Sequence, residues 1–144
     1  MIRALGALLV GGLLLSACGS VSAASGLASW VVQSSYRSSA ATLVGDARHS
    51  ADVLKITNPS NADLHTVCGV LLFDTESANA SLPTPDAQST TLLSKAYTNL
   101  GAGANECYVA STNVDARAKA LQTLTSGLAD LSEASARITS ASTP

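Results

Sequence analysis

The last third of the chain repeats its apolar positions at alternating steps of three and four residues. This spacing places side chains on one face of an α-helix, and a series this long is typical of a helix packed against a neighbour. The sequence therefore predicts a helix over about 113–140 with one buried face. The series consists of Leu121, Leu124, Leu128, Leu131, Ser135 and Ile138.

Three earlier segments show the same periodicity and are separated by residues that interrupt helices. Asn58-Pro59 ends the first segment, because the residue before a proline is driven out of the helical region. The two prolines of Leu82-Pro83-Thr84-Pro85 cannot both lie inside a helix, so they separate the second from the third. Helices are thus predicted over 36–56, from residue 60 onward, and from residue 85 to about 109.

Each predicted helix has an identifiable buried face and start. The faces contain Tyr36, Ala40, Leu43, Ala47, Ser50 and Leu54 in the first; Leu64, Val67, Cys68, Leu71, Leu72, Thr75 and Ala78 in the second; and Leu93, Ala96, Tyr97, Leu100, Ala104, Cys107 and Tyr108 in the third. Capping boxes are predicted at Ser60-x-x-Asp63 and Thr112-x-x-Asp115, and Thr84 is predicted to cap the third helix.

Four amphipathic helices with short connections predict an all-α fold, an antiparallel up-down four-helix bundle. Only 3% of the residues are aromatic, and a core of leucine and small residues suits closely packed helices. Gly101 and Gly103 weaken the third helix, which indicates a close approach to a neighbouring helix. The alternative for 67–73 is a buried strand, since this run contains only apolar residues and glycine.

The N-terminal segment has the form of a lipoprotein signal peptide. Arg3 precedes an uninterrupted run of apolar residues and glycine over 4–15, which is too short to span about 30 Å of hydrocarbon. Leu15-Ser16-Ala17-Cys18 then resembles a lipobox, in which the cysteine thiol receives a diacylglyceryl group. The sequence predicts cleavage before Cys18 and a lipid anchor on its sulfur; a secreted protein without lipid and a retained transmembrane helix are the alternatives.

This anchor predicts attachment to the cell membrane on its extracytoplasmic face. Cleavage removes Arg3 and leaves seven Lys and Arg against ten Asp and Glu, a net charge of −3, which argues against a nucleic-acid partner. The predicted domains are a signal peptide over 1–17, a flexible tether over 18–35, the bundle over 36–140 and a frayed tail over 141–144. Within the tether, Trp30, Val31 and Val32 are expected to pack on the bundle or to lie at the membrane surface, and packing is favoured.

Two cysteines remain once Cys18 is assigned to lipid. In an exported chain, Cys68 and Cys107 are expected to form one disulfide. Cys68 lies 16 residues before Thr84, and Cys107 lies 23 residues after it. Because these distances differ by about seven residues, the pairing requires the second and third helices to be staggered by roughly 10 Å.

The pattern Cys68…Asp74, Leu82-Pro83-x-Pro85-Asp86 and Gly103-Ala104-x-x-Cys107 resembles that of a group of small exported actinobacterial proteins. This resemblance covers about 36–138 and implies a four-helix bundle with paired cysteines, in many cases lipidated. It implies no activity.

Few residues suggest chemistry. His49, Asp52 and His65, with Asp46 and Asp63 nearby in sequence, could supply a zinc or copper ligand set if the turn at Pro59 brings them together. Solvated polar faces are the favoured interpretation, so no metal or other cofactor is predicted. Tyr97 and Tyr108 are expected to fill the core rather than line a ligand pocket. Glu106, Arg117, Lys119, Asp130, Glu133 and Arg137 are expected to lie on solvated faces.

The sequence therefore predicts a non-enzymatic envelope lipoprotein, an interaction or accessory module or an extracytoplasmic binding domain of unknown partner. No catalytic residue is predicted, because the chain contains no serine elbow, phosphate loop or HExxH motif. The alternatives are a metal- or small-ligand-binding lipoprotein that uses the region of His49 and His65, and an envelope enzyme.

Overall fold

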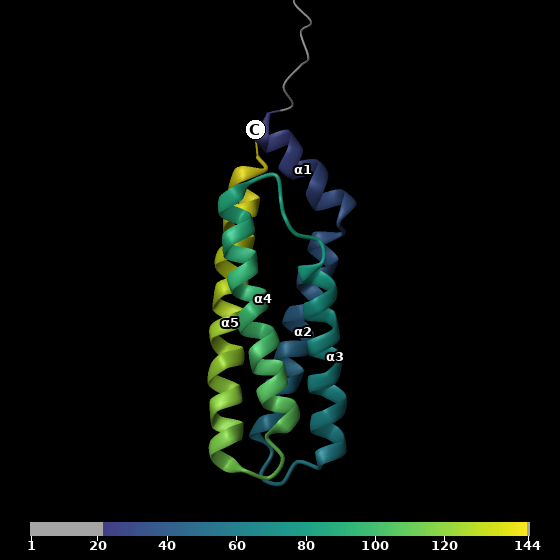
Figure 1. Ribbon diagram of the computed structural model, residues 1–144, viewed down its shortest axis with the longest axis vertical. Coiled ribbons are helices and arrows are strands. Elements are labelled where there is room, and N and C mark those ends of the chain that lie inside the picture. The colour runs from purple at the N-terminus through teal and green to yellow at the C-terminus, as the bar shows by residue number, and fades with distance from the viewer. Residues whose placement is uncertain (1–21, 144) are drawn as a thin grey trace, which may run out of the picture.

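A computed structural model describes residues 22–143, and over this range it contains five α-helices and no strand (Figure 1). The all-α prediction is confirmed for this part of the chain. The strand alternative for 67–73 is wrong, because the segment lies inside a helix. The helices are α1 Ala23–Gln33, α2 Tyr36–Lys55, α3 Asn61–Asn79, α4 Ala87–Val109 and α5 Val114–Ala141.

The predictions for residues 1–17 and for Cys18 concern residues outside the described range. The segment 18–35 was predicted to be a tether, but most of it forms helix α1. α1 starts at Ser22, whose hydroxyl accepts a hydrogen bond from Ser25 N at 3.3 Å. Leu27 and Val31, one helical turn apart, are 0% and 8% exposed. The abundance of serine, alanine and glycine suggested a tether, but burial of this apolar pair favours helix.

Trp30 fixes α1 to the rest of the molecule, as the packing interpretation predicted. Its indole Nε1 donates a hydrogen bond to Ser81 O at 3.2 Å, and its ring centroid lies 5.5 Å from that of Tyr36. Ser81 belongs to the α3–α4 connection, so α1 covers this connection at one end of the molecule (Figure 1). Val32, by contrast, is 78% exposed.

One of the three predicted helix caps is correct. Ser60 accepts a hydrogen bond from Asp63 N at 3.0 Å, as predicted for α3. α5 is capped by Asn113 rather than Thr112, because the Asn113 side chain accepts from Ala116 N at 3.0 Å.

α4 starts two residues later than predicted. Asp86 caps it and accepts from Ser89 N at 2.9 Å. Thr84 instead donates its hydroxyl to Asp86 O at 2.7 Å, which closes a turn just before the helix. A carboxylate accepts stronger hydrogen bonds from backbone N–H groups than a hydroxyl does, which explains why the cap lies at Asp86.

The predicted apolar faces form the core, with one exception. Along α2, Tyr36, Leu43, Ala47, Ser50 and Leu54 are all buried. The fully buried leucines of the other long helices are Leu64 and Leu71 of α3, Leu93 and Leu100 of α4, and Leu124 and Leu131 of α5.

Tyr108 is the exception. It was expected to face the core but is 40% exposed. Its ring turns toward α3, where it lies against Gly69 and stacks on His65 with a centroid distance of 4.3 Å.

α4 and α5 pack unusually closely because small residues recur every seven positions on both helices. A Cβ added to Gly103 would lie 2.9 Å from Leu124 N, and one added to Gly127 would lie 2.9 Å from Leu100 N. The close approach predicted for Gly103 is therefore confirmed. On α4 the buried small residues of the series are Ser89, Ala96 and Gly103, followed by Ala110 at the C-cap. On α5 they are Ala120, Gly127 and Ala134.

Cys68 of α3 and Cys107 of α4 lie at disulfide distance, as predicted, with Cα atoms 5.8 Å apart and both side chains fully buried. The non-helical segment between Asn79 and Ala87 accommodates the required stagger, since it rises from the end of α3 to the higher start of α4 (Figure 1). The α2–α3 and α4–α5 connections lie together at the other end of the molecule.

Candidate functional site

The residues considered for metal binding are not assembled into a site. Asp52 pairs with Lys55 at 3.1 Å on the surface of α2, and His65 stacks on Tyr108. His49 is exposed on α2. Across residues 22–143, no group of three or more His, Cys, Asp or Glu side chains is placed to hold a metal ion.

Asp46 is a partly buried carboxyl on α2 that carries an unpaired oxygen. Its Oδ2 is buried and has no hydrogen-bond partner among the described residues. Burial raises the pKa of Asp46, and the neighbouring Asp74 carboxyl raises it further, while His49 opposes the shift. Asp46 of α2 and Asp74 of α3 thus place two carboxyl groups close together across the α2–α3 contact.

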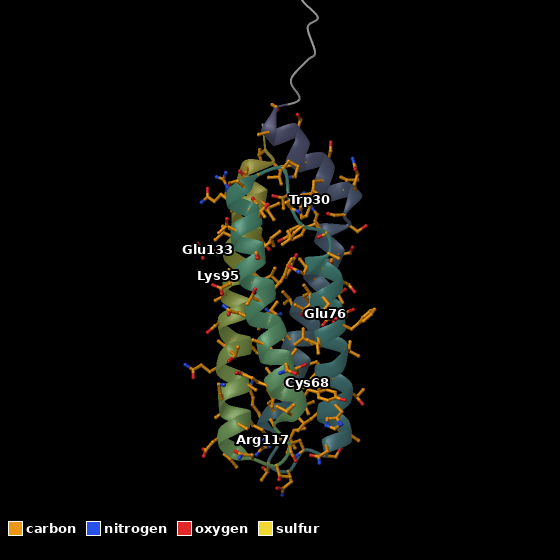
Figure 2. The ribbon with its side chains drawn as sticks, in the orientation of Figure 1. Trp30, Cys68, Glu76, Lys95, Arg117 and Glu133 are labelled. Carbon is orange, nitrogen blue, oxygen red and sulfur yellow. A yellow bond between two sulfur atoms is a disulfide. The ribbon has the colours of Figure 1, made fainter. Side chains whose placement is uncertain are left out.

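Arg117, predicted to be solvated, is only 9% exposed. Its Nη1 donates a hydrogen bond to Ile56 O at 2.6 Å, so its positive charge lies at the C-terminal end of α2, where the helix dipole favours a cation. Figure 2 shows Arg117 at the end of the molecule that holds the α2–α3 and α4–α5 connections. The residue type alone predicted that the Arg117 side chain would be exposed to solvent. Its contact with the end of α2 explains why it is buried instead.

Two ion pairs join α4 to α5 along their length. Lys95 pairs with Asp130 at 2.7 Å, and Glu106 pairs with Lys119 at 2.8 Å. The lysine side chains are more than half exposed, whereas Asp130 and Glu106 are only 12% and 24% exposed. The prediction of a solvated position is therefore correct for Lys119 and for the exposed Glu133, and too simple for Asp130 and Glu106.

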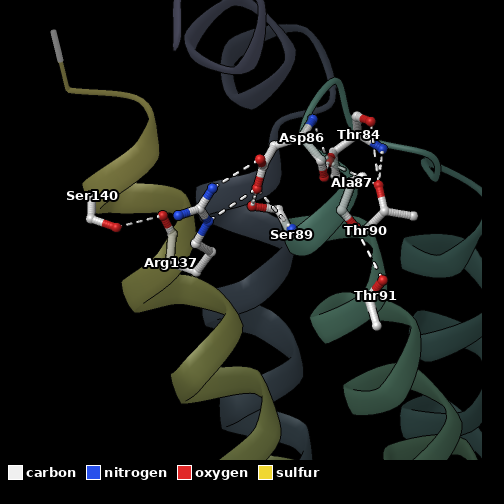
Figure 3. A network of polar contacts seen from close by, with 8 residues as sticks. All are labelled: Thr84, Asp86, Ala87, Ser89, Thr90, Thr91, Arg137 and Ser140. Carbon is white, nitrogen blue, oxygen red and sulfur yellow. Dashed lines mark hydrogen bonds and ion pairs between the residues drawn. The ribbon is translucent and has the colours of Figure 1, made fainter. Parts of the chain in front are cut away.

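Asp86 and Arg137 form the most elaborate of these pairs (Figure 3). Arg137 donates from Nε and Nη2 to the two Asp86 oxygens, at 3.1 and 2.9 Å, while Ser89 donates its hydroxyl to Asp86 Oδ2 at 2.6 Å. The hydrogen bonds from Arg137, then those from Ser89, hold the pKa of Asp86 well below its usual range. This carboxylate caps α4 and fastens its start to the end of α5.

Tyr97 and Tyr36 are structural tyrosines. Tyr97 is 3% exposed, as its predicted role in the core requires, and burial raises its pKa. Tyr36 shares a hydrogen bond with Ser135 at 2.7 Å, so the start of α2 is joined to α5.

A hollow on the described surface lies where α1 meets α2 and the end of α5. It has a volume of about 640 Å³, and a second hollow of about 280 Å³ adjoins it and shares Val31, Arg37, Thr139 and Ser142. We call the two together the proximal groove, because they lie at the end of the molecule where residue 22 is found (Figure 1). Its apolar surface comes from Ala28, Val31, Val32, Ala40 and Ile138.

Exposed apolar side chains gather at the opposite end of the molecule, on and beside the α2–α3 and α4–α5 connections. Ile56 is 52% exposed, Val109 66% and Val114 67%. With Tyr108, these residues define what we call the distal surface. Sequence periodicity did not predict this surface. Periodicity identifies the buried face along a helix, but it does not show whether an apolar residue at the end of a helix is buried or exposed. Val70 and Phe73, at 48% and 68%, are exposed farther along α3.

None of the five helices is long and apolar enough to cross a membrane. Comparison of the chain with known protein families, with curated proteins and with solved structures found no match.

Proposed function

We propose that this chain is a non-enzymatic envelope lipoprotein, tethered through a lipid on Cys18 to the extracytoplasmic face of the cell membrane, that presents a helical bundle to a protein partner. The described part is then an antiparallel up-down bundle of α2 to α5 with α1 as an additional helix. Residue pairs across α4 and α5 support this topology. As the number rises from Asp86 to Lys95 to Glu106, that of the partner falls from Arg137 to Asp130 to Lys119.

The observation that carries the proposed interaction role is the position of the distal surface. Isolated exposed apolar residues are ordinary, but Ile56, Val109 and Val114 gather at one end, and this end lies opposite residue 22. The 28 residues of α5 extend over roughly 42 Å at 1.5 Å per residue. A tether at Cys18 would therefore hold the distal surface away from the membrane, within reach of another envelope protein.

Site-specific photo-cross-linking in intact cells tests this role. A photoreactive residue at Val114 is expected to give one discrete adduct, while the same residue at Ser94, exposed along the side of α4, is expected to give none. Changing Val109→Ser and Ile56→Ser together should remove the Val114 adduct without reducing the helical circular dichroism. Equal adducts at both positions, or none at Val114, would contradict an interaction role for this end.

A further inference from the structure

We propose that the proximal groove binds one acyl chain of an anionic membrane lipid, with Arg37 at the lipid head group. The proposed tether at Cys18 supplies access to such lipids, so this inference rests on the proposed function. The binding chemistry itself depends only on residues of α1, α2 and α5 and on residues that directly flank these helices.

The floor of the groove is apolar and already formed. Val31, Tyr36 and Ile138 contribute to it and are 8%, 6% and 3% exposed, so packing in the core holds these side chains in place beneath the groove. Val32 forms part of the wall and is 78% exposed. A volume of about 640 Å³ falls within the range of roughly 300–1,000 Å³ that is usual for sites of small ligands. An acyl chain would cover apolar surface that water now contacts.

The charge of the groove favours an anionic head group. The chain as a whole has a net charge of −2, yet no Asp or Glu lines either hollow. Arg37 is the one charged residue in the lining and makes no ion pair with a described side chain. A guanidinium binds phosphate through paired, charge-assisted hydrogen bonds. The hydroxyl groups that can add further bonds belong to Ser35, Ser38, Thr139, Ser142 and Thr143.

The position of the groove matches this ligand. Cys18 lies four residues before Ser22, a separation of at most about 14 Å for an extended chain. Ala28, the first lining residue on α1, lies six residues farther along, about 9 Å in a helix. A lipid on Cys18 would thus hold the groove close to the membrane surface. α1 contains no charged residue that would resist such a position.

Binding of a soluble amphiphile tests the proposal without depending on the anchor. The protein is the mature chain, residues 18–144, carrying Cys18→Ser, which includes every described contact. Trp30 is the only tryptophan, and its ring lies 5.5 Å from that of Tyr36, which lines the groove. Its fluorescence should therefore report binding. Dodecyl phosphate, below its micelle concentration, is expected to give a saturable change with one molecule bound, whereas inorganic phosphate should give none. Dodecyl maltoside should bind about tenfold more weakly, since it lacks the charge.

Two pairs of variants locate the site. Arg37→Gln should weaken dodecyl phosphate binding about tenfold, while Arg48→Gln, exposed farther along α2, should leave it unchanged. Ala28→Glu should abolish binding, whereas Ser29→Glu, the next residue but outside the lining, should not. Because Arg37 is exposed, its variant is expected to fold even if Ala28→Glu does not.

Other results would overturn the proposal. These are no saturable change, an equal loss in both arginine variants, or binding of inorganic phosphate as strong as that of dodecyl phosphate. A concentration-dependent dimer that protects Val32 would assign the groove to a second copy instead. Loss of the lipid on Cys18 in cells, with dodecyl phosphate binding intact, would remove the proposed function and leave the groove's chemistry standing.

Discussion

Gly103 and Gly127 set the distance between α4 and α5. Each lies against the backbone of the facing helix, so a methyl group at either position would meet an atom that cannot rotate away. Alanine is intrinsically better than glycine in a helix by about 1 kcal/mol, but overpacking a tight contact costs about 1–3 kcal/mol. At these two positions the steric cost should exceed the gain in helix propensity.

Gly103→Ala is therefore expected to lower the free energy of unfolding by about 1–2 kcal/mol, as measured by urea denaturation. Gly45→Ala is the matched control, because a Cβ at Gly45 would meet no atom within 4 Å. This second change should raise the free energy of unfolding by up to about 1 kcal/mol. If both substitutions raise the free energy of unfolding, the result would contradict the close packing of α4 against α5 at Gly103.

The Asp86 carboxylate should make stability depend on pH. Its pKa is lowered in the folded protein, so the unfolded chain binds the proton more readily. The stabilisation by Asp86 is therefore complete above the unfolded pKa of about 3.9 and is lost progressively as the pH falls below it. Asp86→Asn keeps a residue that can cap a helix but removes the charge that pairs with Arg137.

Asp86→Asn should thus lower the urea concentration at the midpoint of unfolding at pH 7. The difference in this midpoint between the variant and wild type should become smaller as the pH falls from 5 to 2. Urea titrations across this range measure the effect. Glu76→Gln, which changes an exposed carboxylate on α3, should show no comparable pH-dependent difference. A constant difference between wild type and Asp86→Asn at all pH values would argue against the ion pair.

At the scale of elements, helix positions could be predicted from sequence, whereas several details required tertiary contacts. The spacing of apolar residues predicted four of the five helices, because a helix that buries one face must place an apolar residue on that face every three or four positions. α1 was taken for a tether because its composition resembles a linker, whereas contacts with α2 and with the α3–α4 connection bury one of its faces. Arg117 was misplaced for the same reason, since the end of α2 that it binds is distant in sequence.

The link between α3 and α4 should contribute a large share of stability. The bridge from Cys68 to Cys107 closes a loop of 39 residue steps, and the chain-entropy relation gives about 4 kcal/mol for such a loop. Cys68→Ser together with Cys107→Ser should lower the free energy of unfolding by about this amount. Thermal unfolding of wild type with and without reductant provides the comparison. A double variant as stable as the oxidised protein would show that the bridge contributes nothing.

At the scale of the whole molecule, the two ends have different chemistry. The proximal groove joins apolar walls to one arginine and several hydroxyl groups, while the distal surface is mainly apolar and includes Tyr108, on which His65 stacks. A tether near residue 22 would give these ends separate environments, one at the lipid surface and one facing partners. Neither surface could be predicted from sequence, because each is assembled from the termini of different helices.

The account depends most on the lipid proposed for Cys18, and the intact mass of the protein extracted from membranes of its own cells tests this directly. We expect a polypeptide that begins at Cys18 and carries a diacylglyceryl group, with that added mass absent from Cys18→Ser. An unmodified polypeptide that still contains residues 1–17, or one recovered entirely from the cytosol, would contradict the account.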